Sequence, residues 1–428
     1  MREEPMTLSE LLACRAAVAG DEPALAWSRP AVTLTWAALD RRVTAVAAAL
    51  RRVTEPGQRA AVLISPSPDY VVAFLGALRA GLVAIPTGPE RRASVLADAE
   101  PSIVLATAAT VLAVRRFLAT LDTCGHRVLA VDAVPDAPVC PEVRSAAEDV
   151  AYLQYPGGVM VTHANVLANA RQAAGVLGRT TVVTWLPPSD PLGLLLGVAV
   201  PVVAGLPAVI CPELPAGPAG LGSAGTLVRA DDPDLDRLRT AFPPGALRAC
   251  YVVAEATALV ACGRPVGQRV AIVGPDGRRR PAGDVGEIWV SGPNVARGYW
   301  KRPEESARVF CALLPDDDEP RWWLRTGDQG SLDGSGELCV TGRDLVAGCR
   351  AEDLEATAEQ AHPAIRPRAA SAFALPGDQA VVVLQLADGV VPLRGEVERA
   401  VRHAVSVRHG LTLRRVVVRP SSSGDGLW

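Results

Sequence analysis

Residues 152–172 read YLQYPGGVMVTHANVLANARQ. The pattern predicts the end of a strand, a short turn and a helix that begins near residue 163. Junctions of this kind often hold the phosphates of a nucleotide, because the free N–H groups at a helix start attract anions. The turn, residues 155–158, nevertheless reads Tyr-Pro-Gly-Gly and contains no Ser, Thr, Lys or Arg. The sequence therefore leads up to a phosphate site but lacks the usual side chains.

Strands and helices alternate on both sides of this stretch. Before it, residues 59–65 (RAAVLIS) have the pattern of a buried strand and residues 67–81 that of a helix. After the helix from residue 163, residues 180–187 (TTVVTWLP) and 207–211 (PAVIC) are further strand patterns. Such alternation is typical of parallel sheets covered by helices on both faces. We therefore predict an α/β fold with doubly wound, mostly parallel sheets.

The chain divides into two predicted domains. Residues 1–342 form a large N-terminal domain, in which residues 212–247 are rich in Pro, Gly and Asp and weakly patterned. We interpret residues 212–247 as loop or linker with one short helix. Residues 343–428 form a small α+β domain, since residues 352–362, 379–387 and 396–407 have the patterns of a helix, a strand and a helix.

The composition argues against several functional classes. A net charge of −3 gives no electrostatic reason to bind nucleic acid or an anionic membrane. Nine cysteines without a C-x-x-C pair argue against a zinc site or a disulfide framework. The uncharged run at residues 193–210 contains two prolines and three glycines, so a buried helix, turn and strand are favoured over a membrane span. We expect a cytoplasmic protein without a signal peptide or a metal site.

Basic residues are almost all arginine. Among the 43 basic residues, Lys301 is the only lysine, and it lies in the polar stretch GYWKRPEE at residues 298–305. Any mechanism that needs a lysine must therefore use Lys301 or do without one. We interpret Lys301 as a solvated surface cation.

Seven segments along the chain occur in the order known from one superfamily. They are VTLTWAALDRRVTAVAAAL (32–50), AFLGALRAGLVAIP (73–86), GVMVTHANVLANARQ (158–172), TWLPPSDPLGLLLGVAVPVVAGLPAV (184–209), YVVAEATALV (251–260), GEIWVSGPNVARGYWKRPEES (286–306) and LRTGDQGSLDGSGELCVTGRD (324–344). This set resembles the adenylate-forming ligase superfamily from near residue 7 to the C-terminus. The combination of LQY, WLP and YxxAEAT is similar to its fatty-acyl-AMP ligase branch.

The resemblance implies chemistry for which two essential groups are missing. The family activates a carboxylate with ATP and Mg²⁺, releases pyrophosphate and passes the acyl group to a thiol, commonly that of a carrier protein. Its phosphate loop is rich in Thr, Ser and Gly and ends in Lys-Gly, whereas Gly157 stands at the lysine position here. Its C-terminal lysine follows Ser-Ser-Gly, where this chain has Asp425. A carboxylate at that position would repel the reacting anions.

Other family features are altered. We find no counterpart of the adenine-binding strand before Tyr251, and Val252 replaces the usual glycine beside the pocket. After WLP, the usual aromatic-His-Asp run is replaced by Pro-Ser-Asp-Pro at residues 188–191, and the hinge after Asp344 is shortened. The resemblance implies a substrate pocket that includes Trp185, Tyr251 and Val252.

Three family positions are retained. Glu255 matches the Mg²⁺-binding glutamate, Asp328 the aspartate that holds the ribose, and Arg343 the arginine at the ribose and hinge. They are either a residual site for ATP, AMP or Mg²⁺ or structural groups, and we favour the structural interpretation. His163, at the predicted helix start, is either a catalytic group or, as we favour, a capping or packing residue.

Three functional hypotheses follow. In the first, the chain is a shortened ligase homologue that has lost adenylation, needs no cofactor and binds an acyl or polyketide-type intermediate or an acyl carrier protein in lipid or natural-product biosynthesis. In the second, the old acyl pocket catalyses a reaction that does not use ATP. In the third, the chain is an atypical active ligase. We also expect Cys250, Cys262 and Cys349 to be buried, inert thiols.

Overall fold

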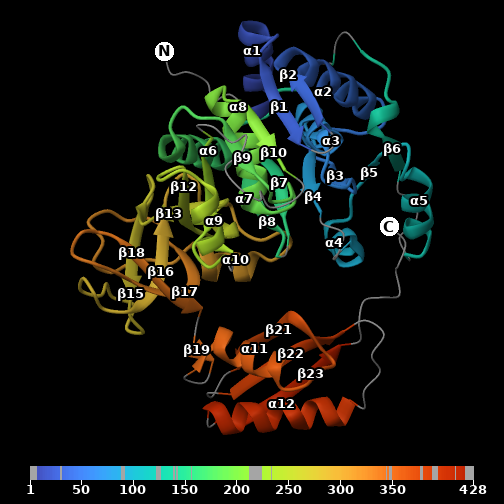
Figure 1. The fold of residues 1–428 in the computed structure, drawn as a ribbon. Helices are drawn as coiled ribbons and strands as arrows, with labels where there is room; N and C mark the ends of the chain where they lie inside the picture. Colours follow the sequence, from blue (N-terminus) through green and yellow to red (C-terminus); the bar gives the residue numbers. More distant parts are fainter. Residues whose placement is uncertain are drawn as a thin grey trace. The chain divides into compact units, whose positions relative to one another are not determined.

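The computed structural model describes residues 7–28, 31–87, 92–121, 127–137, 140, 143–155, 157–211, 224–232, 234–343, 345–346, 349–375, 379–387, 394–409 and 411–419 (Figure 1). It separates into two compact units. The first comprises Met1–Ala271, Trp289–Thr326 and Gly336–Leu338, and the second Ile272–Ile288, Gly327–Ser335 and Cys339–Trp428. The domain boundary at residues 342–343 stays a prediction.

A six-stranded sheet forms the centre of the first unit. Its order is β6-β5-β3-β4-β7-β8, and all neighbouring pairs are parallel except β7–β8. The strands are β3 (Arg59–Val62), β4 (Val83–Pro86), β5 (Ile103–Ala106), β6 (Arg127–Ala130), β7 (Val150–Gln154) and β8 (Val159–Thr162). The helices between them are α3 (Pro68–Arg79), α4 (Arg92–Ala99) and α5 (Val111–Ala119). The predicted α/β class with mostly parallel sheets is confirmed.

A second sheet of the first unit has the order β2-β1-β10-β9. Its strands are β1 (Pro23–Ser28), β2 (Ala31–Thr35), β9 (Val182–Thr184) and β10 (Ala208–Ile210), and α1 (Leu8–Ala19), α2 (Trp36–Arg51) and α6 (His163–Leu177) belong to the same unit. The uncharged run folds as α7 (Pro191–Leu194), a π-helical stretch (Leu195–Ala199), α8 (Val200–Ala204) and β10. In the described part of the chain no helix is long and apolar enough to cross a membrane.

The segment at residues 212–247 is more regular than predicted. Residues 212–223 and 233 lie outside the described residues, but β11 (Thr226–Arg229) and α9 (Leu235–Ala241) are present. The sheet order here is β11-β12-β13-β14, with β12 (Leu247–Val252), β13 (Leu259–Cys262) and β14 (Arg264–Pro265). The prediction of one short helix is confirmed by α9, and the loop prediction is wrong for β11. A run of four residues is too short to show strand periodicity, although Leu227 and Val228 are buried.

A further sheet has the order β15-β16-β17-β18, formed by β15 (Arg269–Val273), β16 (Gly286–Ser291), β17 (Leu324–Leu332) and β18 (Leu338–Arg343). Helix α10 (Pro303–Phe310) lies between β16 and β17 in sequence, and β19 (Leu345–Val346) pairs with β20 (Cys349–Arg350).

The C-terminal part of the second unit has its own core. Its sheet has the order β21-β22-β23, with β21 (Ile365–Leu375), β22 (Gln379–Leu386) and β23 (Leu413–Arg419). Helices α11 (Ala351–Gln360) and α12 (Arg394–His409) pack against the sheet and each other, and α12 runs along one side of it in Figure 1. Buried Leu354, Val382 and Val401 belong to one apolar cluster. The predicted helix, strand and helix are confirmed.

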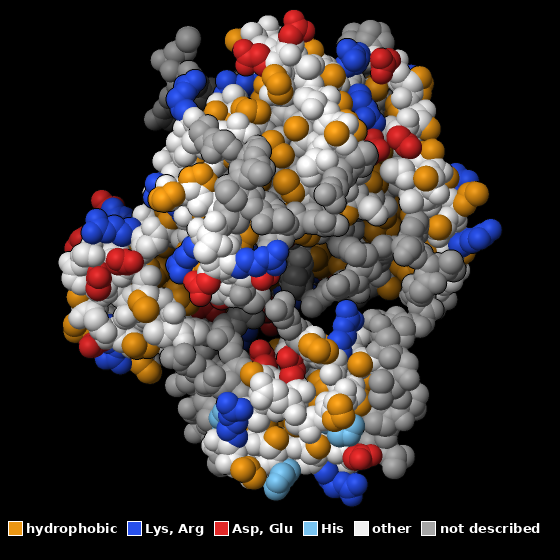
Figure 2. All heavy atoms as spheres, viewed as in Figure 1, with side chains coloured by type: hydrophobic (Ala, Val, Ile, Leu, Met, Phe, Trp, Pro, Cys, Tyr) orange, Lys and Arg blue, Asp and Glu red, His pale blue; other side chains and the backbone are white. Residues whose placement is uncertain are grey.

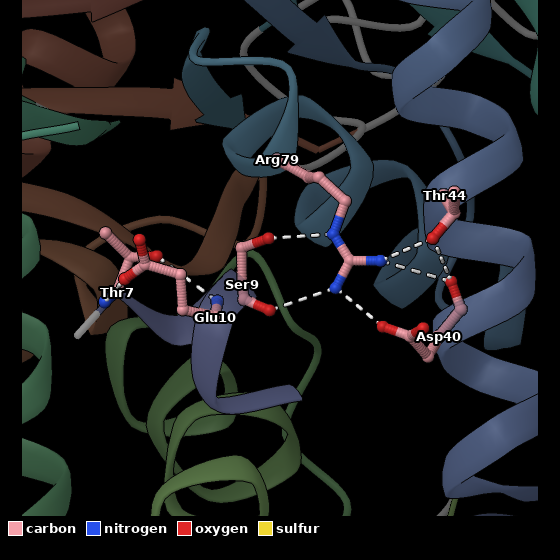
Figure 3. Close-up of polar contacts among 6 residues, drawn as sticks. All are labelled: Thr7, Ser9, Glu10, Asp40, Thr44 and Arg79. Atoms are coloured by element: carbon pink, nitrogen blue, oxygen red, sulfur yellow. Dashed lines mark hydrogen bonds and ion pairs between the residues drawn. The ribbon is translucent and has the colours of Figure 1, made fainter. Parts of the chain in front are cut away.

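Arg79 joins the three helices at the N-terminal side of the first unit (Figure 3). Its guanidinium donates to the hydroxyl and carbonyl oxygens of Ser9 in α1, both at 2.9 Å. It also donates to the Asp40 carboxylate at 2.6 Å, the Asp40 carbonyl at 3.2 Å and the Thr44 hydroxyl at 2.6 Å, all in α2. Five hydrogen bonds thus satisfy the planar guanidinium, and they fix α3 against α1 and α2.

Candidate functional site

The turn between β7 and β8 is as short as the sequence predicts. Gln154 and Val159 are cross-strand partners, so only residues 155–158 reverse the chain. Pro156 lies outside the described residues, while Gly157 and Gly158 have φ angles of 101° and 68°. Backbone in this left-handed region strongly favours glycine. A four-residue hairpin turn cannot also supply the long series of N–H groups that surrounds a triphosphate.

Residues 297–300 cover the free edge of β8 and the turn. The Met160 N–H donates to the Gly298 carbonyl at 2.8 Å, and the Arg297 N–H donates to the Met160 carbonyl at 2.9 Å. The Trp300 N–H donates to the Gly158 carbonyl at 2.8 Å. A Cβ atom added at Gly158 would lie 3.3 Å from the Cβ of Trp300. The backbone of residues 297–300 is therefore packed against the place where a longer loop would begin.

Glu255 is bonded to this covering segment. It lies in a short 3-10 turn (Ala254–Ala256) after β12, is half-buried, and its Oε1 accepts a hydrogen bond of 2.9 Å from the Tyr299 hydroxyl. The Ala296 N–H donates to the Glu255 carbonyl at 2.8 Å. Burial and then the charge of Glu255 raise the pKa of Tyr299, so the hydroxyl keeps its proton and remains a donor. One oxygen of the family's metal-binding carboxylate thus already has a partner within the chain.

A second hydrogen-bonded pair of a tyrosine and a carboxylate lies at the turn before β8. The Tyr155 hydroxyl donates to Asp98 Oδ2 at 2.6 Å, from the turn to the end of α4. Burial and this hydrogen bond raise the pKa of Tyr155. Lys301 pairs with Glu100 at 2.9 Å and donates to the Asp98 carbonyl at 3.1 Å, and its side chain is 43% exposed. The partly exposed cation predicted at Lys301 is present, and it binds the end of α4.

ATP and Mg²⁺, which the resemblance implies, fit these residues poorly. The turn carries no side chain that could hold a phosphate, and Tyr299 and Trp300 lie against it. Glu255 Oε1 already accepts a hydrogen bond from Tyr299. Asp425 lies outside the described residues. We therefore assign no step to ATP or Mg²⁺.

The three family residues at the predicted nucleotide site belong to different units. Glu255 is in the first unit, whereas Asp328 and Arg343 are in the second. Asp328 is half-buried in β17. Arg343 ends β18, and its side chain lies outside the described residues, as does the hinge residue Asp344. Their role in a nucleotide site stays a prediction.

The predicted substrate-pocket residues lie on two separate segments. Trp185 follows β9 and packs against Phe242 with ring centroids 6.1 Å apart, beside an apolar cluster that includes Val228. Tyr251 and Val252 end β12 and are half-buried. The two cavities described, of about 350 and 230 Å³, are lined by other residues. An acyl pocket at these three residues therefore stays a prediction.

His163 takes the first position of α6, as predicted. The preceding Thr162 caps the helix, and Thr162 and Asn165 exchange side-chain and backbone hydrogen bonds. His163 is only 5% exposed, and its Nδ1 has no hydrogen-bond partner among the described residues. Burial lowers its pKa, against the charges of Asp149 and Glu10, which raise it. The burial and the lowered pKa fit a neutral packing residue.

The sequence interpretation missed Tyr299. Its partner Glu255 is 44 positions away, and nothing in the local pattern of GYWKRPEE distinguishes the tyrosine. The available signal was the shortened turn itself, because a deletion beside a buried strand leaves space that another segment must fill.

Acidic and basic side chains are interspersed on the face of the first unit seen in Figure 2. This distribution agrees with the small net charge of −3. The surface viewed there offers no broad basic area among its coloured side chains.

Known proteins similar to this chain are named as fatty-acid ligases. The model of the family described as AMP-binding enzyme matches residues 12–222 and 244–300, more than half of the chain. The putative fatty-acid--CoA ligase fadD25 of Mycobacterium tuberculosis is 32% identical over 524 residues, which cover 92% of this chain and 90% of that protein. The long-chain-fatty-acid--AMP ligase FadD26 of Mycobacterium marinum is 31% identical, with coverages of 92% and 88%.

Solved structures give the same fold. A fatty acid AMP ligase from Legionella pneumophila superposes with a TM-score of 0.69 at 22% identity, covering 97% of this chain and 92% of that chain. The sequence alignment with fadD25 extends over 524 residues, more than the 428 residues of this chain. The relative therefore contains segments that have no counterpart here.

Proposed function

This chain belongs to the AMP-binding enzyme family, and on that premise we propose that it is a fatty-acyl-AMP ligase homologue that has lost adenylation. In this proposal it binds an acyl or polyketide-type intermediate, free or carried by an acyl carrier protein, in the cytoplasm. ATP, AMP and Mg²⁺ are not required for that role.

The hydrogen bond from Tyr299 to Glu255 carries the proposal. Glu255 Oε1 accepts a hydrogen bond from the Tyr299 hydroxyl at 2.9 Å, so one of the two carboxylate oxygens at the family's Mg²⁺ position already has a partner within the chain. The tyrosine belongs to the segment that hydrogen-bonds to β8 and Gly158. One segment therefore contacts both the short turn and Glu255, and Asp425 in place of the C-terminal lysine supports the proposal separately.

The acyl ligand is inferred from the relatives. FadD26 and the Legionella protein are named for long-chain fatty acids or fatty acids, and this chain aligns with most of FadD26. Since ligand class follows the site rather than the fold, the inference needs a direct test.

Pyrophosphate release is the first test. The purified chain is incubated with ATP, Mg²⁺ and saturated fatty acids of several lengths, beside an active fatty-acyl-AMP ligase as the positive control. We expect no release above the rate without fatty acid. Release that depends on the fatty acid would make the chain an atypical active ligase and overturn the proposal.

Nucleotide binding is the second test. Calorimetry with ATP and with AMP is expected to show no binding in the wild type or in Tyr299→Phe, because removing the hydroxyl frees Glu255 but does not restore the turn. Micromolar binding that Asp328→Ala abolishes would show that a nucleoside site remains.

Ligand binding is the third test. Calorimetry compares a dodecanoyl-loaded acyl carrier protein, the unloaded carrier protein and free dodecanoic acid. Binding of the loaded carrier or of the free acid supports the proposal, and tighter binding of the loaded than of the unloaded carrier places recognition on the acyl group. If none of the three binds, the acyl role is wrong. Conversion of an acyl substrate without ATP would instead select a repurposed enzyme.

A further inference from the structure

Two cysteines lie opposite each other on neighbouring strands. Strands β12 and β13 are antiparallel, and Tyr251 pairs with Ala261. The preceding residue of β12, Cys250, is therefore opposite the following residue of β13, Cys262. Residues opposite each other in an antiparallel pair point to the same face of the sheet. The two thiols, twelve positions apart in the sequence, are thus brought together by the strand register.

The spacing of such a pair suits a disulfide. Opposite residues of antiparallel strands have Cα atoms about 5.5 Å apart in hydrogen-bonded pairs and about 4.5 Å apart in the others. A disulfide requires a Cα separation of about 4.4 to 6.8 Å. Either kind of pair lies within that range.

The two thiols have different surroundings. Cys250 is 2% exposed and its Sγ donates to the Val228 carbonyl at 3.1 Å, whereas Cys262 is half-buried. The neighbouring thiol lowers the pKa of Cys262 and raises the pKa of Cys250. Burial opposes ionisation of Cys262, and the charge of Arg248 favours it. Cys262 is therefore the thiol that an oxidant reaches and the one that ionises more readily.

We propose that Cys250 and Cys262 form an oxidative modification site that closes to a disulfide on reaction with a peroxide. The thiolate of Cys262 attacks one peroxide oxygen and becomes a sulfenic acid, while the other oxygen leaves as water after protonation. The thiol of Cys250 then attacks the sulfenic sulfur and releases a second water. The two thiols together lose two hydrogen atoms, and the peroxide is reduced.

The position of the pair gives the modification a structural consequence. Val252 and Glu255 lie two and five positions after Cys250 in the chain, and Cys262 ends β13. A covalent bond between the strands would hold both ends of residues 250–262, which contain all of the retained YVVAEAT motif. This inference is independent of whether the chain has lost adenylation.

The test uses a single peptide. Trypsin cleaves after Arg248 and Arg269 but not after Arg264, which precedes Pro265, so both cysteines are recovered in the peptide 249–269. The folded protein is treated with hydrogen peroxide, alkylated with N-ethylmaleimide and digested without reductant. We expect the peptide to appear without alkyl groups and lighter by two hydrogen atoms. Oxidation of the exposed Cys14 shows that the oxidant was active.

Two single variants test the roles of the thiols. In Cys250→Ala, Cys262 lacks its resolving partner, so dimedone is expected to trap it as a sulfenic acid. In Cys262→Ala, the buried Cys250 is expected to remain a thiol while Cys14 reacts. Equal oxidation of Cys250 in that variant would reverse the roles and overturn the proposed order.

An unfolded sample tests the role of strand register. In urea the disulfide should form more slowly than in the folded protein, because the strands no longer hold the thiols together. Two results would overturn the proposal. One is a doubly alkylated peptide 249–269 from folded protein in which Cys14 is oxidised. The other is a disulfide that forms faster in urea than in the folded protein.

Discussion

Arg79 and Glu255 both connect segments far apart in the sequence, but they are satisfied in different ways. Arg79 is a permanent cation whose five hydrogen bonds all end on acceptors of α1 and α2. Glu255 is a half-buried carboxylate that receives one hydroxyl, from Tyr299. Around Arg79 the helical framework is held by a group that cannot lose its charge. Around Glu255 the partner is a neutral tyrosine hydroxyl.

This difference predicts how well each region tolerates substitution. A fully bonded arginine tolerates little change, because each lost partner leaves a polar group without compensation. A tyrosine hydroxyl on a half-buried carboxylate is easier to gain or lose, since water can replace it. We therefore expect substitutions to cost much more stability at the Arg79 cluster than at the edge of β8.

Arg79→Ala tests the framework and has the largest expected effect. The substitution removes the donor that Asp40, Thr44 and Ser9 share. We expect the free energy of unfolding to fall by about 3 kcal/mol. This is the lower end of the range for breaking a buried ion pair, because Asp40 remains partly solvated. Urea unfolding gives the value. Arg79→Lys should recover only a small part of it, since an ammonium cannot reproduce the planar guanidinium.

Arg239→Ala is the matched control. Arg239 pairs with Asp236 at 3.1 Å, but the two side chains are 58% and 96% exposed. Such a pair contributes about 0.5 kcal/mol or less. Equal unfolding midpoints for the Arg79 and Arg239 variants would remove the contrast between the two regions.

The elements predicted from the sequence are those with a repeated local pattern. Helix α6 begins where the sequence places it, because Thr162 and Asn165 cap it within a single turn. The framework helices are equally visible in their apolar spacing. Strand β11 was missed because four residues give too few repeats, and its burial depends on pairing with β12.

The bonds that decide the site depend on contacts that no local pattern contains. Tyr299 reaches Glu255 across 44 positions, and Arg79 reaches Ser9 across 70. The sequence predicted that the phosphate loop was missing but not what would cover its place. The resemblance to the ligase family identified the positions Glu255, Asp328 and Arg343. It could not predict which side chains bond to them in this chain.

Asn169→Ala tests α6, which connects the rebuilt edge to the framework. The Asn169 amide donates to the Leu259 carbonyl at 2.8 Å and accepts from the Leu259 N–H at 2.9 Å, and the residue is fully buried. Truncation leaves the Leu259 N–H without this acceptor, whereas the Leu259 carbonyl still accepts from Gln268 at 3.2 Å and from Asn294 at 3.3 Å. We expect a cost of about 2 kcal/mol in urea unfolding. Arg171→Ala, at an exposed site of the same helix, should change stability little. A loss no greater than that of the control would mean that water replaces the amide.

Tyr299→Phe tests the edge directly. We expect a loss of about 1 kcal/mol in urea unfolding, because the hydroxyl bonds to a charged group that water can still reach. Tyr70→Phe is the control, since the Tyr70 hydroxyl is buried and has no hydrogen-bond partner among the described residues. Removing that hydroxyl should leave stability unchanged or raise it. If the Tyr299 variant is as stable as the Tyr70 variant, the bond to Glu255 does not hold the covering segment in place.

His163 offers the smallest effect and a dependence on pH. Burial lowers its pKa in the folded chain, while the unfolded chain takes up the proton near the ordinary value of about 6.5. The stability from the neutral imidazole is therefore present above that pH and is lost as the pH falls below it, with a slope of at most about 1.4 kcal/mol per pH unit. Between pH of about 7.5 and 5.5, the wild type should lose more stability than His163→Asn. His403→Asn, at an exposed position of α12, should follow the wild type. Equal losses of stability in the wild type and in His163→Asn would mean that the imidazole takes up a proton as readily in the folded state as in the unfolded chain. The start of α6 would then be as open to water as the neighbouring edge of β8.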